Sequence, residues 1–175
     1  IQQQCLKLSR LIGDLVTLSR LDEENPFPEK APFSLSDAAW EISEPFASLA
    51  KARGKTYACQ IQDGVTLTGD KAAVQQMISI LLDNAVKYSD EGGDVSLTVR
   101  RKGKKALVEV YSTCAHPPAD LDRLFDRFYR GDASHSGAKA GNGIGLSIAK
   151  ATAQAHGGDL TVQSRDGGIV FQARF

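Results

Sequence analysis

The sequence lacks the features that define several common classes of protein. Its three cysteines, Cys5, Cys59 and Cys114, are widely separated, which excludes a disulfide framework and a CxxC metal motif. No apolar run approaches the roughly 20 residues of a membrane span, and no signal peptide begins the chain. Lys+Arg and Asp+Glu number 21 each, so the formal net charge is zero and argues against bulk electrostatic binding of nucleic acid or anionic lipid. We therefore expect a cytoplasmic location, no nucleic-acid partner and no direct membrane contact.

What the sequence does contain is enough for one folded domain with an appendage. The chain has 175 residues, of which 42% are hydrophobic, so it can form a core without metals or disulfides. Residues 1–22 have the pattern of a coiled-coil helix, in which apolar residues alternate at spacings of four and three: Ile1, Cys5, Leu8, Ile12 and Leu15. Three further residues widen this stripe toward that of a bundle helix: Leu11, Leu18 and Leu21.

A lone helix cannot bury such a stripe, so the pattern predicts a partner helix. The alternative is a helix that folds back on its own domain. Residues 23–33 contain three prolines and are predicted to be a linker.

From residue 34 to residue 175 the pattern predicts an α/β domain. Helices are expected over 34–51, from Asp70 to about 88, and over 143–156, with a short helical piece near 118–124. Strands are expected at 56–61, 65–68, 94–100, 106–112, 159–165 and 168–175. The segment 113–141 is rich in Pro, Gly, Ser and charge, which is typical of a flexible loop.

The segment LLDNAVKYSD (81–90) places an amide and a cation on one side of the long predicted helix. Asn84 offers a neutral oxygen, and Lys87 follows three residues later. This pair suits Mg²⁺ together with phosphate, because Mg²⁺ prefers oxygen ligands and phosphate attracts a point positive charge. Taken alone, an Asn near a helix end is more often a helix cap or a solvated side chain than a ligand.

Two further segments carry the other polar signals. In GNGIGLSIAK (141–150), Gly141, Gly143 and Gly145 allow close approach of the backbone to a ligand, and the following helix presents free N–H groups to a phosphate. A tight turn before a helix is the alternative. In LFDRFYRGD (124–132), the spacing of Phe125 and Phe128 predicts packing on one side of a short helix, and the arginines Arg127 and Arg130 are within reach of phosphates.

In this order and spacing, the three segments resemble the catalytic, ATP-binding domain of sensor histidine kinases. LLDNAVKYS is similar to the N box of the family, LFDRFYRGD to its F box and GNGIGLSIAK to its second glycine box. The resemblance implies a two-layer α/β sandwich, the fold of histidine kinase, gyrase and chaperone ATPases, in which a mixed sheet packs on helices. Residues 1–22 resemble the second helix of the family's dimerisation and phosphoacceptor hairpin. The chain would then divide into 1–22, a linker at 23–33 and a catalytic domain at 34–175.

The resemblance also implies roles for individual residues. Asn84 would coordinate Mg²⁺, Lys87 would contact phosphate, and Phe125 and Phe128 would pack the lid over 113–141. The remaining ATP-binding residues would be Tyr88, Arg130, Gly141, Gly143, Gly145 and Leu146. The implied cofactors are ATP and Mg²⁺, and the implied partners are a second copy through the N-terminal helix and the receiver domain of a response regulator.

The implied reaction is transfer of the γ-phosphoryl of ATP to a histidine. None of His116, His135 and His156 lies in the family's phosphoacceptor context, so we expect that histidine upstream of residue 1 and no catalytic residue in this chain. An ATPase of the chaperone or topoisomerase type would need Glu four residues before Asn84, where this chain has Ile80.

The sequence departs from the family where adenine would bind. The family's Asp-x-Gly-x-Gly, whose Asp accepts a hydrogen bond from the adenine amino group, is missing, and either Tyr111 or Ser112 takes the place of the Asp. Ile169 replaces a usual Thr after Gly168, and Ile80 replaces a frequent Asn. The alternative function is therefore a degenerate kinase domain with weak or no ATP binding that acts as a dimeric signalling scaffold.

Overall fold

The order of helices and strands follows the predicted α/β alternation. The structure is a computed structural model that describes residues 2–129 and 143–175. The elements are α1 (Gln2–Leu21), β1 (Ala31–Ser34), α2 (Leu35–Ala52), β2 (Thr56–Ile61), β3 (Thr66–Gly69), α3 (Lys71–Tyr88), β4 (Asp94–Lys102), β5 (Lys105–Thr113), the 3-10 helix η1 (Asp122–Phe125), α4 (Gly145–Ala155), β6 (Asp159–Arg165) and β7 (Gly168–Arg174). Within the described residues, no helix combines the length and apolar character needed to cross a membrane.

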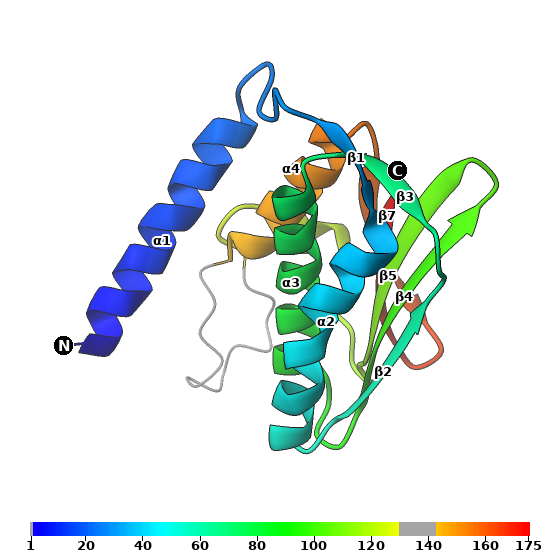
Figure 1. Ribbon diagram of the computed structural model, residues 1–175. Coiled ribbons are helices and arrows are strands. Elements are labelled where there is room, and N and C mark those ends of the chain that lie inside the picture. The colour runs from blue at the N-terminus through cyan, green and yellow to red at the C-terminus, as the bar shows by residue number, and fades with distance from the viewer. Residues whose placement is uncertain (1, 130–142) are drawn as a thin grey trace.

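The main sheet has five strands in the order β2-β4-β5-β7-β6. It is mixed, because β2 runs parallel to β4 whereas the other neighbours are antiparallel. Helices α2, α3 and α4 lie on one face of this sheet (Figure 1). This arrangement confirms the expected two-layer sandwich of a mixed sheet on helices.

The core forms between the sheet and α3, because the apolar face of α3 meets the apolar alternate residues of the strands. Helix α3 begins where the Asp70 carboxylate accepts a hydrogen bond from the Ala73 N–H at 2.9 Å. Its inward residues are fully buried: Val74, Met77, Ile78, Leu81 and Leu82. Alternate residues of β4 meet them from the sheet: Val95, Leu97 and Val99.

Strand β1 was not predicted, because its residues fall partly in the proposed linker. It pairs antiparallel with β3 in a separate two-stranded sheet, with Ala31 opposite Gly69. All of β1 is at least partly exposed and it contains Pro32, so no alternation of burial marks it in the sequence. Strand β3 accordingly pairs with β1 and not with β2, although a short turn joins β2 to β3.

The apolar stripe of α1 divides between two faces. Leu18 is buried against Ile144 and Ile148 of the α4 region, and Leu11 and Leu21 pack beside it. The residues of the coiled-coil seam instead remain in solvent: Leu8 is 59%, Ile12 54% and Leu15 43% exposed. One side of α1 therefore packs on its own domain, as the alternative interpretation held, while the seam stays available to a partner helix.

His156 joins the linker to the ends of α3 and α4. Its Nε2 accepts a hydrogen bond from the Asp70 N–H at 3.0 Å, and its Nδ1 lies 2.7 Å from the Thr152 carbonyl oxygen and donates to it. The ring packs against Phe27, with centroids 4.9 Å apart. Burial lowers the pKa of His156 below its usual value. These contacts give His156 a structural role in the fold.

Candidate functional site

The C-terminal half of α3 and the N-terminus of α4 meet on the helical side of the sheet. Ile80 packs against Ile144 and Ile148, and a Cβ added to Gly145 would lie 3.3 Å from the Ile80 Cγ2. Asn84 lies one turn after Ile80 and therefore shares its face of α3. The fold thus brings together the first and second polar segments, which are about 60 residues apart in the sequence.

Asn84 is half-buried and oriented by its own helix. Its Nδ2 donates a hydrogen bond to the Ile80 carbonyl oxygen at 3.0 Å, which leaves Oδ1 without a protein donor among the described residues. Within residues 2–129 and 143–175, no group of three or more His, Cys, Asp or Glu side chains is placed to hold a metal ion. An Asn oxygen fits Mg²⁺ when phosphate and water supply the other ligands, which is the usual way that nucleotide sites hold this ion.

Lys87 forms an ion pair within its own helix. Its Nζ lies 2.5 Å from Oδ2 of Asp83, one turn earlier on α3. The i,i+4 spacing of Asp83 and Lys87 was a signal that would have found this pair. Tyr88, the last residue of α3, is 47% exposed.

The glycine segment turns the chain into α4. Gly143 has a φ of +67°, and a Cβ there would lie 2.9 Å from the Phe128 carbonyl carbon, so both conformation and space favour glycine. Ile144, the residue before α4, has no polar side chain with which to cap the helix, and the first N–H groups of α4 suit an anion. Leu146 is partly buried against the core. Arg130 and Gly141 lie outside the described residues.

The two phenylalanines of the F-box segment have different surroundings. Phe125 packs edge-on against Phe171 of β7, with centroids 6.0 Å apart, and the Lys150 Nζ lies 4.8 Å from its ring centroid. Phe128 is 61% exposed, so the prediction that it packs beside Phe125 is wrong. The reason is that η1 ends at Phe125, and Phe128 follows in a turn with a left-handed φ of 65°.

This segment also contacts α1. The Arg127 NH2 lies 3.0 Å from the Asp22 Oδ1, just beyond the end of α1. The two residues are 105 positions apart, and no pattern in the sequence connects them.

At the end of β5, the side chains of Ser112 and Tyr111 lie on opposite faces of the sheet. Ser112 follows the inward alternation of Val108 and Val110, is 8% exposed, and lies between Val95 of β4 and Ile169 of β7. Tyr111 points to the opposite face of the sheet, where its hydroxyl donates to the Asp166 carbonyl oxygen at 3.0 Å. Only Ser112 therefore faces the helical layer that contains Asn84.

Comparison with known proteins agrees with the sequence resemblance. The family described as "Histidine kinase-, DNA gyrase B-, and HSP90-like ATPase" matches residues 69–175. The probable sensor protein PcoS of Escherichia coli is 34% identical over 173 residues, which cover 98% of this chain and 37% of PcoS. The sensor histidine kinase RppB of Synechocystis is 32% identical over 166 residues, covering 94% of this chain and 37% of RppB. The chain thus spans little more than a third of these relatives.

Solved structures share the fold. The histidine kinase AdeS of Acinetobacter baumannii superimposes with a TM-score of 0.81 at 18% identity, covering 99% of this chain and 80% of AdeS. The histidine kinase ThkA, solved in complex with the response regulator TrrA, gives a TM-score of 0.76 at 20% identity, covering 98% of this chain and 48% of that one.

Proposed function

Because the chain belongs to the histidine kinase-, DNA gyrase B- and HSP90-like ATPase family and is the ATP-binding catalytic domain of a sensor histidine kinase, we propose that it holds Mg-ATP between α3 and α4. The observation that carries this proposal is the close approach of Gly145, at the N-terminus of α4, to Ile80, which shares a face of α3 with Asn84. We assign residues 1–22 to the second helix of a dimerisation hairpin, 23–33 to a linker and 34–175 to the catalytic domain.

Each residue of the site has a part in positioning the nucleotide. Asn84 would hold Mg²⁺ through Oδ1, and the ion would neutralise charge on the phosphates. The α4 N-terminus, with Gly143 and Gly145, would receive phosphate oxygens through backbone N–H groups. Lys87 would exchange Asp83 for a phosphate oxygen, and Tyr88 and Leu146 would line the nucleotide pocket. Arg130 and Gly141 are proposed as further phosphate contacts on the basis of the family resemblance alone.

The reaction requires a histidine that residues 1–175 do not supply. The γ-phosphoryl would pass from ATP to an imidazole nitrogen on a preceding helix, leaving ADP, and then to an aspartate of a response regulator. Such transfer depends mainly on positioning and charge neutralisation. The exposed seam of α1, formed by Leu8, Ile12 and Leu15, supports a homodimer in which that helix is paired.

Calorimetric titration with Mg-ATP tests the site directly. Asn84→Ala should weaken Mg-dependent ATP binding by at least about tenfold, because one direct metal ligand is lost. Asn25→Ala, at an exposed position of the linker, is the matched control and should bind as the unmodified chain does. Equal ATP affinity in the Asn84 variant and the control would refute the proposed magnesium site. Autophosphorylation of a longer protein that includes the preceding helix tests the transfer itself.

One observation favours a degenerate domain as the second candidate. The position that faces the helices at the end of β5 is Ser112, and its neighbours there are apolar. A missing charge-assisted hydrogen bond to adenine costs about 1.5–3 kcal/mol, or roughly 10- to 100-fold in affinity. Ordinary micromolar binding of Mg-ATP by the unmodified chain would remove this candidate.

A further inference from the structure

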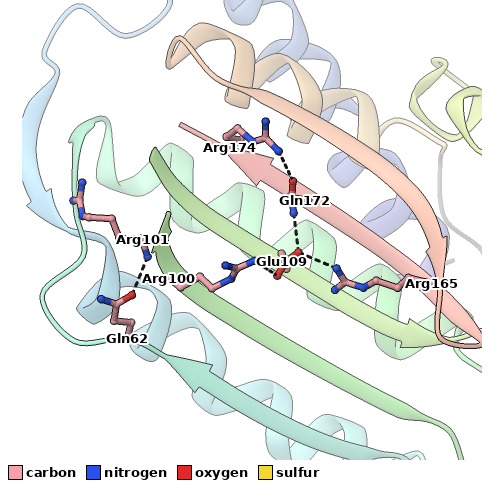
Figure 2. A network of polar contacts seen from close by, with 7 residues as sticks. All are labelled: Gln62, Arg100, Arg101, Glu109, Arg165, Gln172 and Arg174. Carbon is pink, nitrogen blue, oxygen red and sulfur yellow. Dashed lines mark hydrogen bonds and ion pairs between the residues drawn. The ribbon is translucent and has the colours of Figure 1, made fainter. Parts of the chain in front are cut away.

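The face of the five-stranded sheet that points away from the helices carries a cluster of basic side chains. Strand register places Arg100 opposite Leu107, which in turn lies opposite Arg174. In the row nearest the β4–β5 turn, Lys102 lies opposite Lys105. Arg165 extends toward the same region from β6 (Figure 2). We call Arg100, Lys102, Lys105, Arg165 and Arg174 the basic face.

Most of this positive charge is not neutralised by carboxylates of residues 2–129 and 143–175. Lys102 and Lys105 are exposed, and in the described part of the chain neither forms an ion pair with a carboxylate. Asp159 lies opposite Arg174, but its carboxylate is 3.1 Å from the Lys150 Nζ. Like charges directly opposite each other destabilise a sheet. An external anion bound across these strands would relieve that repulsion.

The basic face already binds one carboxylate, that of Glu109. Figure 2 shows this side chain at the centre of the network, where its Oε1 accepts from the Gln172 Nε2 at 2.7 Å and from the Arg165 NH1 at 3.3 Å. The Arg100 NH2 lies 3.6 Å from its Oε2. Burial opposes ionisation of Glu109, but the bond from Gln172 and the charges of Arg165 and Arg100 lower its pKa. Both arginine side chains remain 43% exposed and keep donors for further carboxylates.

The surface beside the cluster is open to solvent. A shallow depression of about 290 Å³ lies between β2 and β4, and its lining is Gln60, Ile61, Gln62, Thr98, Val99 and Arg100. Glutamine and threonine side chains at this place can exchange hydrogen bonds with a peptide backbone. The depression adjoins the basic face through Arg100, so an extended segment lying across the strands would meet both.

The composition of this face argues against other anionic partners. The large exposed hydrophobic residues lie on α1 and at Trp40, Tyr88 and Phe128, so this face has none to insert into a bilayer. Of the described residues that point outward from the sheet, only Tyr111 is aromatic, and its hydroxyl is bonded to Asp166, which leaves little for base stacking.

We propose that the basic face is a docking surface for an acidic segment of a partner protein. Arginine forks receive carboxylates in a bidentate geometry, and the lysines add charge at the edge of the same surface. The surface lies on the opposite side of the sheet from α3 and α4. Binding there is therefore independent of the proposed nucleotide site.

Fluorescence anisotropy with a labelled peptide of about ten glutamates tests this surface on the full chain. Lys102→Gln/Lys105→Gln should weaken binding at least about fivefold, and Arg174→Gln added to this pair should weaken it further. Lys7→Gln/Lys51→Gln removes the same charge from exposed positions on α1 and α2 and should leave binding within about twofold. Raising the salt from about 50 to about 300 mM should weaken binding of the unmodified chain, because exposed charges are screened.

Four results would overturn the proposal. The first would be that the unmodified chain does not bind the peptide at the lower salt. The second would be that the control pair loses as much affinity as the Lys102 and Lys105 pair. The third would be that vesicles containing phosphatidylserine, or duplex DNA, bind the chain more tightly than the peptide does and that the same variants weaken this binding. The fourth would be that the chain self-associates at low salt through these lysines, because a second copy would then be the occupant. Circular dichroism and thermal melting of each variant separate loss of binding from loss of fold.

Discussion

Replacing Ser112 with aspartate should restore the adenine contact that the proposed site lacks. Ser112 is 8% exposed, faces the helical layer and lies in register with Val95 and Ile169. A carboxylate at this position can accept a hydrogen bond from the adenine amino group. A hydrogen bond to a charged group contributes about 1.5–3 kcal/mol, so affinity for ATP should rise roughly 10- to 100-fold.

The same change carries a cost in the absence of nucleotide. The new carboxylate replaces a small hydroxyl between apolar neighbours, and desolvation of an unpaired charge there destabilises the fold. A loss of about 1–2 kcal/mol corresponds to a fall in Tm of roughly 2–8 °C for a chain of this size. Saturating ATP should recover that loss more fully in Ser112→Asp than in the unmodified chain, because ligand binding adds to stability.

Calorimetry and thermal shift with ATP and GTP provide the assay. GTP carries a carbonyl where ATP carries the amino group, so its affinity should not rise. Ser112→Asn is the matched control of similar size without charge, and its gain should be smaller. Tyr111→Asp should not increase ATP affinity, because Tyr111 lies on the opposite face. ATP affinity that stays within about twofold in a folded Ser112→Asp variant, or that rises in Tyr111→Asp, would refute the assignment.

The remaining predictions concern the contacts around the site. The pKa of His156 is lowered on folding, so the unfolded chain binds more protons as the pH falls below 6.5, and the free energy of unfolding should fall there. Chemical denaturation at pH 7.5 and at about 5.5 should show a smaller fall in the free energy of unfolding for His156→Gln than for the control His116→Gln. An equal fall would contradict a half-buried neutral imidazole. Leu18→Ala should weaken the docking of α1 on the domain by about 2–3 kcal/mol and so speed hydrogen exchange in α1. Leu8 is 59% exposed, so Leu8→Ala should change neither. Gly168→Ala would place Cβ 2.5 Å from the Tyr111 Cε2, so we expect a lower Tm, and an unchanged melting curve would show that β7 moves without cost.

Much of the fold was predictable because its signals are local. The 3.6-residue period of α3, its Asp70 cap and the alternation of β4 and β5 each involve residues within a few positions of one another. The candidate site was also largely predictable, since Asn84 and Gly145 lie in short segments whose composition suits phosphate and Mg²⁺. The structure confirms the local signals of the fold, whereas the roles of Asn84 and Gly145 stay predictions.

Other features required contacts between distant residues. Strand β1 has no alternation of its own and exists through its pairing with β3. Phe128 was predicted to pack like Phe125, but the position where η1 ends decides otherwise. The ion pair of Arg127 with Asp22 joins segments that no periodicity relates.

The sequence by itself determined that this protein is an α/β ATPase domain of the histidine kinase type, preceded by a helix with an apolar seam, because spacing and residue type within short segments express those features. Only the tertiary structure decided which of Tyr111 and Ser112 faces the helices, since a shift of one residue on a strand moves a side chain to the other face. It also decided that α1 packs by Leu18 while Leu8 stays exposed, and that five basic residues from four strands share one surface. The physical reason is that strand register and helix docking depend on interactions between residues far apart in the chain.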